Sequence, residues 1–300
     1  MLMRVGVVIL PELRWPDAGR RWRRAEELGF DHAWTYDHLA WRSLRDGPWF
    51  GAIPTLTASA MVTDRIRLGT LVASPNFRHP VPFAKELMTL DDIAGGRLTV
   101  GIGAGGTGWD AEMLGVDPWS PRERSERFAE FVALTDELLR NPASASSTGR
   151  YYSAHEARML PGCVQQPRVP LAVAAFGDRA MRVAAKYGDA WVTVGDPTRA
   201  DAASGPLPGP EGAAVVAAQM QRLEAACADA GRDPVTLDRI VLTGTLLDGG
   251  LASAAAFEDT VSAYEAVGVT DLVVHWPRAD GIYAGDEARF ETVCAEVIAR

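Results

Sequence analysis

The fold is decided by the stretch GGRLTVGIGAGG, residues 95–106, which is followed by TGWDAE at 107–112. A glycine turn leads into a short apolar strand, and this strand ends in a run of glycines. Glycines at a strand end allow the backbone to approach a flat or anionic ligand, because no side chain intervenes. Ligands of parallel α/β proteins bind at the carboxyl ends of strands. The stretch therefore predicts one wall of a ligand site, although a tight turn that binds nothing explains a glycine run alone equally well.

Two common phosphate-binding motifs do not fit this stretch. A P-loop needs Gly-Lys-Ser/Thr after its glycines, and none follows here. The dinucleotide fingerprint places its glycines where a helix begins, whereas Gly101 and Gly103 lie within the predicted strand. The remaining walls of the site must therefore come from other parts of the chain.

The composition is that of an ordinary globular protein. The 300 residues are 47% hydrophobic and 23% charged, and the net charge of -9 disfavours nucleic acid as a partner. Three widely spaced cysteines indicate neither a disulfide framework nor a zinc cluster, and the histidines lack the spacing of a metal-binding helix. No apolar run reaches the roughly 20 residues that span a bilayer. We expect a reduced, cytoplasmic protein without a metal.

Short apolar runs alternate with longer helical patterns along the chain. The predicted strands cover residues 5–10, 31–36, 66–73, 98–103, 170–174, 190–194, 240–247 and 272–276. The predicted helices cover residues 16–28, 53–63, 82–93, 121–139, 178–187, 213–230, 252–267 and 286–299. Because a helix follows each strand, the strands are expected to be parallel and joined by crossover helices.

Eight such units predict a closed (β/α)8 TIM barrel that forms one domain over residues 1–300. A doubly wound open sheet is the alternative, but it usually carries a glycine fingerprint in its first turn, and the first turn here, residues 10–14, has no glycine. The segments 141–169 and 196–212 are rich in proline, glycine and small residues. They are predicted to be insertion loops at the C-terminal face of the barrel, with a short hairpin near 150–152.

Candidate catalytic residues stand at the end of the second predicted strand, which reads Asp37-His38. A histidine beside an acid can donate, accept or shuttle a proton near neutral pH. A polar pair that only caps the loop is the alternative, and the place at the top of a barrel favours the functional interpretation. Aromatic walls suit a planar ring, although tryptophans also pack in cores. The substrate pocket is predicted to be lined by Trp41, Trp49, Trp109 and Trp276.

The fifth predicted strand runs into Phe176, Gly177, Asp178 and Arg179, where a helix begins. The free amides at a helix N-terminus form an anion site, while Asp178 is equally consistent with a plain helix cap. Because an aspartate repels a phosphate, the backbone amides and Arg179 would have to bind it. A pocket with glycine, aromatic, histidine and anion-binding walls suits a phosphorylated planar redox cofactor.

Several motifs resemble those of the bacterial luciferase-like superfamily, and they cover nearly the whole chain. They are RIRLGT at 65–70, FRHP at 77–80, LDDIAGGR at 90–97, GIGAG at 101–105, QPRVP at 166–170 and AAKYGDAW at 184–191. The resemblance implies a (β/α)8 barrel that binds reduced FMN or the deazaflavin coenzyme F420. It also implies a monooxygenase, a dehydrogenase or a reductase that is commonly a homodimer.

The resemblance assigns roles to individual residues. Asp37 and His38 match an Asp-His pair of deazaflavin-dependent members, in which the histidine serves acid/base chemistry or stabilises developing charge near the reacting ring. A non-prolyl cis peptide that backs the ring falls on Leu71 and Val72, and the phosphate segment falls on 176–179. The predicted cofactor-binding residues are therefore Leu71, Val72, Gly103, Gly105, Gly106, Phe176, Gly177, Asp178 and Arg179.

Two positions depart from the family pattern. Gly106 stands where some deazaflavin dehydrogenases carry a proton-donating glutamate, and Phe176 stands where a small or hydroxyl residue is usual. We expect an oxidoreductase that uses F420 or a flavin to transfer a hydride to or from a small organic substrate. The alternatives are an FMN-dependent monooxygenase that uses O2 and a partner reductase, and a non-catalytic flavin-binding barrel.

Overall fold

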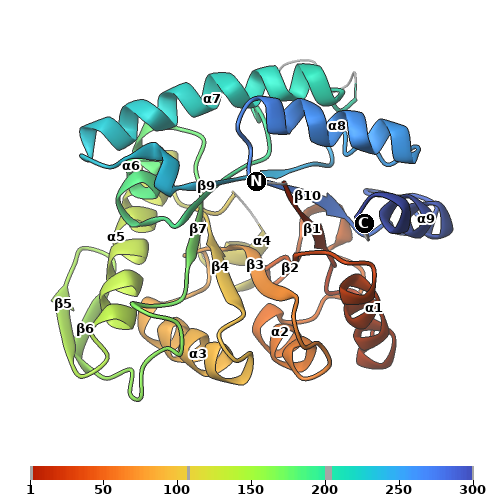
Figure 1. The fold of residues 1–300 in the computed structure, drawn as a ribbon. Helices are drawn as coiled ribbons and strands as arrows, with labels where there is room; N and C mark the ends of the chain where they lie inside the picture. Colours follow the sequence, from red (N-terminus) through yellow and green to blue (C-terminus); the bar gives the residue numbers. More distant parts are fainter. Residues whose placement is uncertain (1–2, 107–108, 200–204, 299–300) are drawn as a thin grey trace.

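The computed structural model describes residues 3–106, 109–199 and 205–298, and its strands close into a parallel barrel (Figure 1). Two parts of the predicted site loops, residues 107–108 and 200–204, lie outside the described residues, as do 1–2 and 299–300. The strands follow one another around the barrel in the order β1-β10-β9-β8-β7-β4-β3-β2. Their bounds are Arg4–Val8 (β1), His32–Thr35 (β2), Arg67–Ala73 (β3), Leu98–Ile102 (β4), Leu171–Ala174 (β7), Ala190–Thr193 (β8), Asp238–Leu242 (β9) and Asp271–His275 (β10). The predicted (β/α)8 barrel is confirmed.

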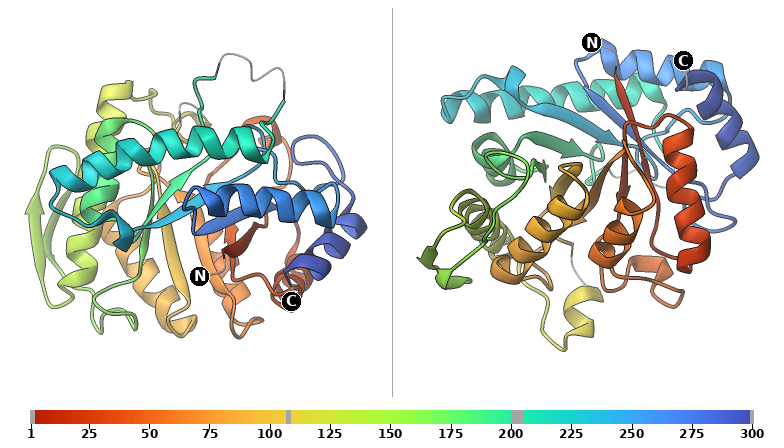
Figure 2. Two further views of the ribbon diagram at one scale, coloured as in Figure 1. Left: turned by 45° about the horizontal axis from the view of Figure 1, so that its top comes forward. Right: turned by 60° about the horizontal axis from the view of Figure 1, so that its bottom comes forward.

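The helices form an outer layer around the strands (Figures 1 and 2). Their bounds are Trp15–Glu27 (α1), Ala52–Ala60 (α2), Pro80–Ile93 (α3), Pro121–Arg140 (α5), Asp178–Tyr187 (α6), Gly209–Asp229 (α7), Ala254–Ala266 (α8) and Glu287–Val297 (α9). Sequence signals define several of these ends. The capping box of Ser120 and Glu123 begins α5, and Asp286 accepts from two amides at the start of α9. None of the described helices is both long and apolar enough to cross a bilayer.

Two apolar clusters build the core, because side chains alternate between the two sides of each strand. The larger cluster lies between strands and helices and includes Val7, Trp22 and Phe128. The smaller cluster fills the barrel and includes Val8 and Trp34. Toward the carboxyl ends of the strands the side chains of this smaller cluster include aromatic rings. Aromatic rings therefore form part of the wall of the opening at this end of the barrel, which we call the mouth.

The amino end of the barrel is closed by polar side chains. His32 on β2 bonds to Asp271 through Nε2, at 3.0 Å from Oδ1, and accepts a hydrogen bond from the Trp34 indole at Nδ1. Arg4 donates to both oxygens of Asp271, at 2.6 and 2.7 Å. This network satisfies buried polar groups at the end opposite the mouth.

The carboxyl end of β3 carries the predicted irregularity. The peptide between Leu71 and Val72 is cis, as the family resemblance implies, and the register of β3 against β4 shifts between Thr70 and Ala73. A β-carbon on Gly103 would lie 2.6 Å from Cγ2 of Val72. Glycine is therefore needed at this position, because a side chain would push against the bulge.

The insertion 141–169 contains the predicted hairpin, with β5 at Ala145–Thr148 and β6 at Ser153–Ala157, and the hairpin lies outside α5. The insertion was predicted at the C-terminal face, but it joins the end of α5 to the start of β7. It therefore begins and ends at the amino side of the strands, where Gln165 donates to the carbonyl of Leu98, the first residue of β4, at 2.8 Å.

Other connections also differ from the predictions. Helix α7 begins at Gly209 rather than at 213, and β9 ends at Leu242 rather than at 247 because Gly244 adopts a positive φ. Three short helices of the described residues were not predicted, because five residues or fewer show no helical period: η1 at Arg42–Leu44, α4 at Trp109–Met113 and η3 at Pro234–Thr236.

Candidate active site

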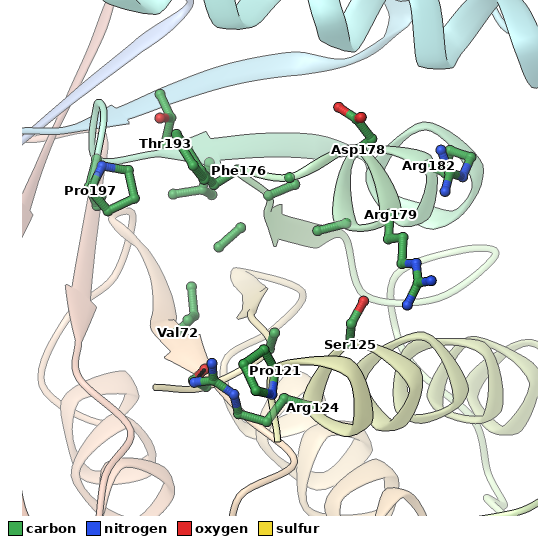
Figure 3. A pocket seen from close by; sticks show the side chains of 18 of the residues that line it. Val72, Pro121, Arg124, Ser125, Phe176, Asp178, Arg179, Arg182, Thr193 and Pro197 are labelled. Atoms are coloured by element: carbon green, nitrogen blue, oxygen red, sulfur yellow. Dashed lines mark hydrogen bonds between the residues drawn. The ribbon is translucent and has the colours of Figure 1, made fainter. Parts of the chain in front are cut away.

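A cavity of about 1050 Å³ opens at the carboxyl ends of the barrel strands (Figure 3). Its walls come from the ends of β3, β7, β8 and β9, from the loop after β4, and from the first turns of α5 and α6. The labelled side chains include Val72 from β3, Arg124 and Ser125 from α5, Phe176 from the loop before α6, and Arg179 from the first turn of α6. The cavity is thus at the place where barrel enzymes carry their active sites.

Most of the predicted cofactor-binding residues lie on this one cavity. The lining includes Leu71, Val72, Gly105, Phe176, Gly177, Asp178 and Arg179. Gly103 and Gly106 do not line it. Gly103 is buried beside the Val72 side chain, and the exposed Gly106 accepts a hydrogen bond from Asn76 through its carbonyl oxygen. The two strand segments and the α6 segment, far apart in sequence, are therefore brought together.

The N-terminus of α6 faces the cavity with backbone donors that have no partner among the described residues. Gly177 caps this helix without a side-chain hydrogen bond, and the first intrahelical amide is that of Met181, which donates to the Gly177 carbonyl at 2.9 Å. The carboxylate of Asp178 binds Arg222 on α7 at 2.6 Å, and this hydrogen bond lowers the pKa of Asp178. The negative charge of Asp178 is therefore compensated by a cation, and the amides remain available to an anion.

Two arginines extend this anion-binding end across the cavity. In Figure 3, Arg179 reaches from α6 toward Ser125 on α5, and Arg124 lies on the opposite side. Arg124 donates to the Gly105 carbonyl at 3.4 Å, while its buried Nε has no hydrogen-bond partner among the described residues. Buried donors are nearly always satisfied, so an unused guanidinium N–H beside a cavity fits an anionic ligand group.

The predicted Asp-His pair does not form as a pair. His38 binds a different acid: its Nδ1 lies 2.8 Å from Oδ2 of Asp110, at the start of α4. Asp37 is buried and binds Arg78, which donates to Oδ1 at 2.7 Å. Neighbouring residues beyond a strand end point in different directions, which explains why sequence adjacency identifies the wrong carboxylate. The role of Asp37 remains a prediction, and its structural partner is Arg78.

Aromatic side chains form another wall of the mouth. Trp41 stacks on Trp49 with ring centroids 6.4 Å apart and on Tyr283 at 6.0 Å. The Tyr36 hydroxyl lies 2.7 Å from Nε2 of His275 and 3.1 Å from the Tyr283 hydroxyl. Leu71 and Val72 belong to the same apolar cluster, so this wall is continuous with the floor of the cavity.

The sequence of the first two thirds of the chain matches a family profile. Residues 3–204 match the profile described as luciferase-like monooxygenase. The chain belongs to this family. The superfamily resemblance found in the motifs is thereby confirmed.

Curated relatives of this luciferase-like protein include two kinds of enzyme. An F420-dependent glucose-6-phosphate dehydrogenase from Beutenbergia cavernae is 39% identical over 173 residues, which are 56% of this chain and 49% of that protein. The 4-hydroxyprotoasukamycin monooxygenase of Streptomyces nodosus subsp. asukaensis is 31% identical over 217 residues, which are 71% of this chain and 53% of that protein. The chain thus spans about half the length of these curated relatives.

Solved structures share the fold over the full chain. An F420-dependent secondary alcohol dehydrogenase in complex with an F420-acetone adduct has a TM-score of 0.79 and 19% identity, with 100% of this chain and 99% of that chain covered. The monooxygenase RslO1 from Streptomyces bottropensis has a TM-score of 0.78 and 20% identity, with 99% of each chain covered. At this identity the likeness establishes the fold of the luciferase-like chain alone.

One predicted pocket residue is wrong. Trp276 of the luciferase-like chain points out of the barrel, where it packs on Phe290 of α9 and donates to Glu287 at 2.7 Å. The residue before it, His275, points inward to Tyr36 instead. Adjacent residues at the end of a strand face opposite sides, and the sequence does not reveal which of the two faces inward.

The remaining predicted tryptophan, Trp109, lies on α4 beside the His38 partner. The guanidinium carbon of Arg45 is 3.9 Å from its ring centroid. Sequence reasoning missed Arg124, Asp110 and His275 as members of the site of this luciferase-like protein. The available signals were the helix start after Pro121 for Arg124 and the glycine-rich stretch preceding Asp110.

Proposed function

We propose that this protein is an oxidoreductase that uses coenzyme F420 to transfer a hydride to or from a small organic substrate. The observation that carries the proposal is the cavity at the carboxyl end of the barrel, whose anion-binding end includes the unpartnered, buried Nε of Arg124. Family membership and the F420-dependent relatives support the same conclusion. When bound, such a cofactor supplies a ring carbon that accepts or delivers a hydride.

The residues of the site divide into three groups by the task each would perform. The α6 amides, Arg179 and Arg124 would hold the phosphate of the cofactor, because the carboxylate of Asp178 is bound to Arg222 and Nε of Arg124 has no partner among the described residues. Leu71 and Val72 would support the ring. His38 would exchange a proton with the substrate oxygen, because it follows the carboxyl end of β2 and its side chain is 21% exposed.

Titration of the purified protein with F420 and with FMN, followed by fluorescence quenching, tests the proposal. We expect F420 to bind in the micromolar range or tighter and FMN to bind more weakly. Failure of both to bind contradicts the proposal. Binding of F420 without any turnover, over a panel of alcohols and carbonyl compounds, would instead favour the non-catalytic barrel, which the glycine at 106 permits.

An FMN-dependent monooxygenase is the second candidate function. The observation that favours it is the monooxygenase relative, whose match covers 71% of this chain compared with 56% for the dehydrogenase. FMN binding that is tighter than F420 binding, together with O2 consumption that needs an added flavin reductase, would select this function. The proposal also includes a homodimer in the cytoplasm, and sedimentation of the purified protein tests the dimer.

A further inference from the structure

We propose that Asp110 is the positioning residue of the site: it holds His38 in one tautomer, so that Nε2 of His38 is the atom that exchanges the substrate proton. The inference rests on the proposed function, because it assigns a role within the proposed reaction. The partner acid of His38 is then not its sequence neighbour Asp37 but Asp110, which lies 72 positions after His38 in the chain.

Both carboxylate oxygens of Asp110 are engaged. Oδ2 lies 2.8 Å from Nδ1 of His38, and Oδ1 accepts the backbone N–H of Leu39 at 2.7 Å. An ionised carboxylate can only accept, so the hydrogen of a neutral His38 must be on Nδ1 and the lone pair on Nε2. The second bond to Leu39 fixes the carboxylate to the same loop that carries His38, which defines the position of the imidazole.

The Asp110 side chain remains ionised in this setting. Burial opposes ionisation, but the hydrogen bond from His38 and the backbone N–H groups of Leu39 and Ala40 prevail and lower the pKa of Asp110. The side chain is only 3% exposed, so it does not reach a substrate in the mouth. Asp110 therefore acts through His38 and is not itself a proton donor.

Asp37, the acid next to His38 in sequence, already binds another side chain. Arg78 binds both oxygens of Asp37, and the Asp37 side chain is 2% exposed. A stable guanidinium–carboxylate pair satisfies this buried carboxylate and leaves it no role as a partner of the imidazole. Nε2 of His38 has no hydrogen-bond partner among the described residues, which leaves it available to a ligand.

The proton balance follows from this arrangement. If an alcohol is the substrate, its hydroxyl proton would pass to Nε2 of His38, and a bound F420 would be the acceptor of the hydride that leaves the carbon with the bonding electron pair. The Nδ1 hydrogen stays between His38 and Asp110, whose negative charge compensates the imidazolium. In the reverse direction the same Nε2 returns the proton to the carbonyl oxygen.

Asp110→Asn tests the role, with Glu112→Gln as the matched control, since Glu112 is an exposed acid on the same short helix. The asparagine can present an N–H to Nδ1 and thereby favour the opposite tautomer. We expect kcat to fall at least about tenfold, because a wrong histidine tautomer costs up to about 10⁴ in a serine-protease triad. The F420 dissociation constant should change by less than about twofold. Glu112→Gln should match the wild type in both.

Two further measurements separate positioning from a general structural effect. Nitrogen-15 NMR of the cofactor-free protein should show hydrogen on Nδ1 of His38 in the wild type and loss of this preference in Asp110→Asn. In a His38→Ala background, Asp110→Asn should lower kcat no further. An unchanged tautomer, or equal additive losses in both backgrounds, would overturn the assignment. A protein that binds no F420 refutes the proposed function instead, and the NMR result still decides the pairing.

Discussion

Tyr36 and His275 meet across the mouth of the barrel, with the Tyr36 hydroxyl 2.7 Å from Nε2 of His275. The residue that follows the second barrel strand and the final residue of the last strand are thereby joined at the site, 239 positions apart in the chain. The His275 ring also stacks on Tyr283, with centroids 3.6 Å apart. The His275 side chain is buried between these two partners, so the protonation of His275 is coupled to folding.

The buried imidazole of His275 predicts acid sensitivity. Burial lowers the pKa of His275 from 6.5 to about 3, so between these values the unfolded chain binds a proton that the folded chain does not. Stability therefore falls as the pH falls, by about 1.4 kcal/mol per unit below about pH 6.5, and this contribution reaches about 3 kcal/mol near pH 4.5. Urea unfolding between pH 7.5 and 4.5 should show this loss in the wild type and a smaller slope in His275→Gln. His155→Gln, at an exposed histidine, should retain the wild-type slope.

The contact between Gly103 and Val72 predicts that Gly103→Ala is harmful. The new β-carbon would lie 2.6 Å from Cγ2 of Val72, and overpacking of this kind costs about 1–3 kcal/mol. We expect a lower melting temperature and weaker F420 binding, because the displaced Val72 lines the cavity. Gly106→Ala is the control for stability, since no atom lies within 4 Å of a β-carbon there. Equal stability of the two variants would show that the bulge at Leu71–Val72 can shift to accommodate the methyl group without a loss of stability.

Arg179 should distinguish cofactors by their phosphate. If the α6 end binds the phosphate, Arg179→Gln should weaken FMN binding about tenfold and leave riboflavin binding unchanged, because riboflavin lacks the phosphate. Arg23→Gln, at an exposed arginine on α1 away from the cavity, serves as the charge-matched control. An equal loss for FMN and riboflavin would contradict the placement of the phosphate.

The polar network at the amino end of the barrel contains two aspartates that both bind Arg4. We expect them to contribute very different amounts to the free energy of unfolding. Asp271 is buried and also bonds to His32, whereas Asp238 is 45% exposed. Removing one partner of a buried ionic network leaves the others unsatisfied, so Asp271→Asn should cost about 2–4 kcal/mol of unfolding free energy. Asp238→Asn should cost less than about 1 kcal/mol, because an exposed pair is screened by solvent. Chemical denaturation of both variants at pH 7 measures the difference, and similar losses would show that Asp271 contributes no more than a surface pair.

The regular part of the fold was predictable because it follows local rules. Each barrel strand is a short apolar run and each helix has its own period and end signals, as with Gly29 after α1 and the Gly95-Gly96 turn after α3. The predicted strand ends also indicated where the site lies, because parallel strands place their carboxyl ends at one face of the barrel. Irregular connections carry no such period, which is why α4 was not predicted and why α7 begins four residues early.

The sequence by itself determined the barrel, the face that carries the site, and the segments 71–72, 105 and 176–179 that meet at one cavity. Only the tertiary structure decided which carboxylate holds His38, and that His275 rather than Trp276 faces the mouth. The reason is physical: periodicity fixes the path of the backbone, but pairings between side chains on different loops depend on how those loops turn in space. Asp110 and His38 are distant in sequence, and no local signal connects them.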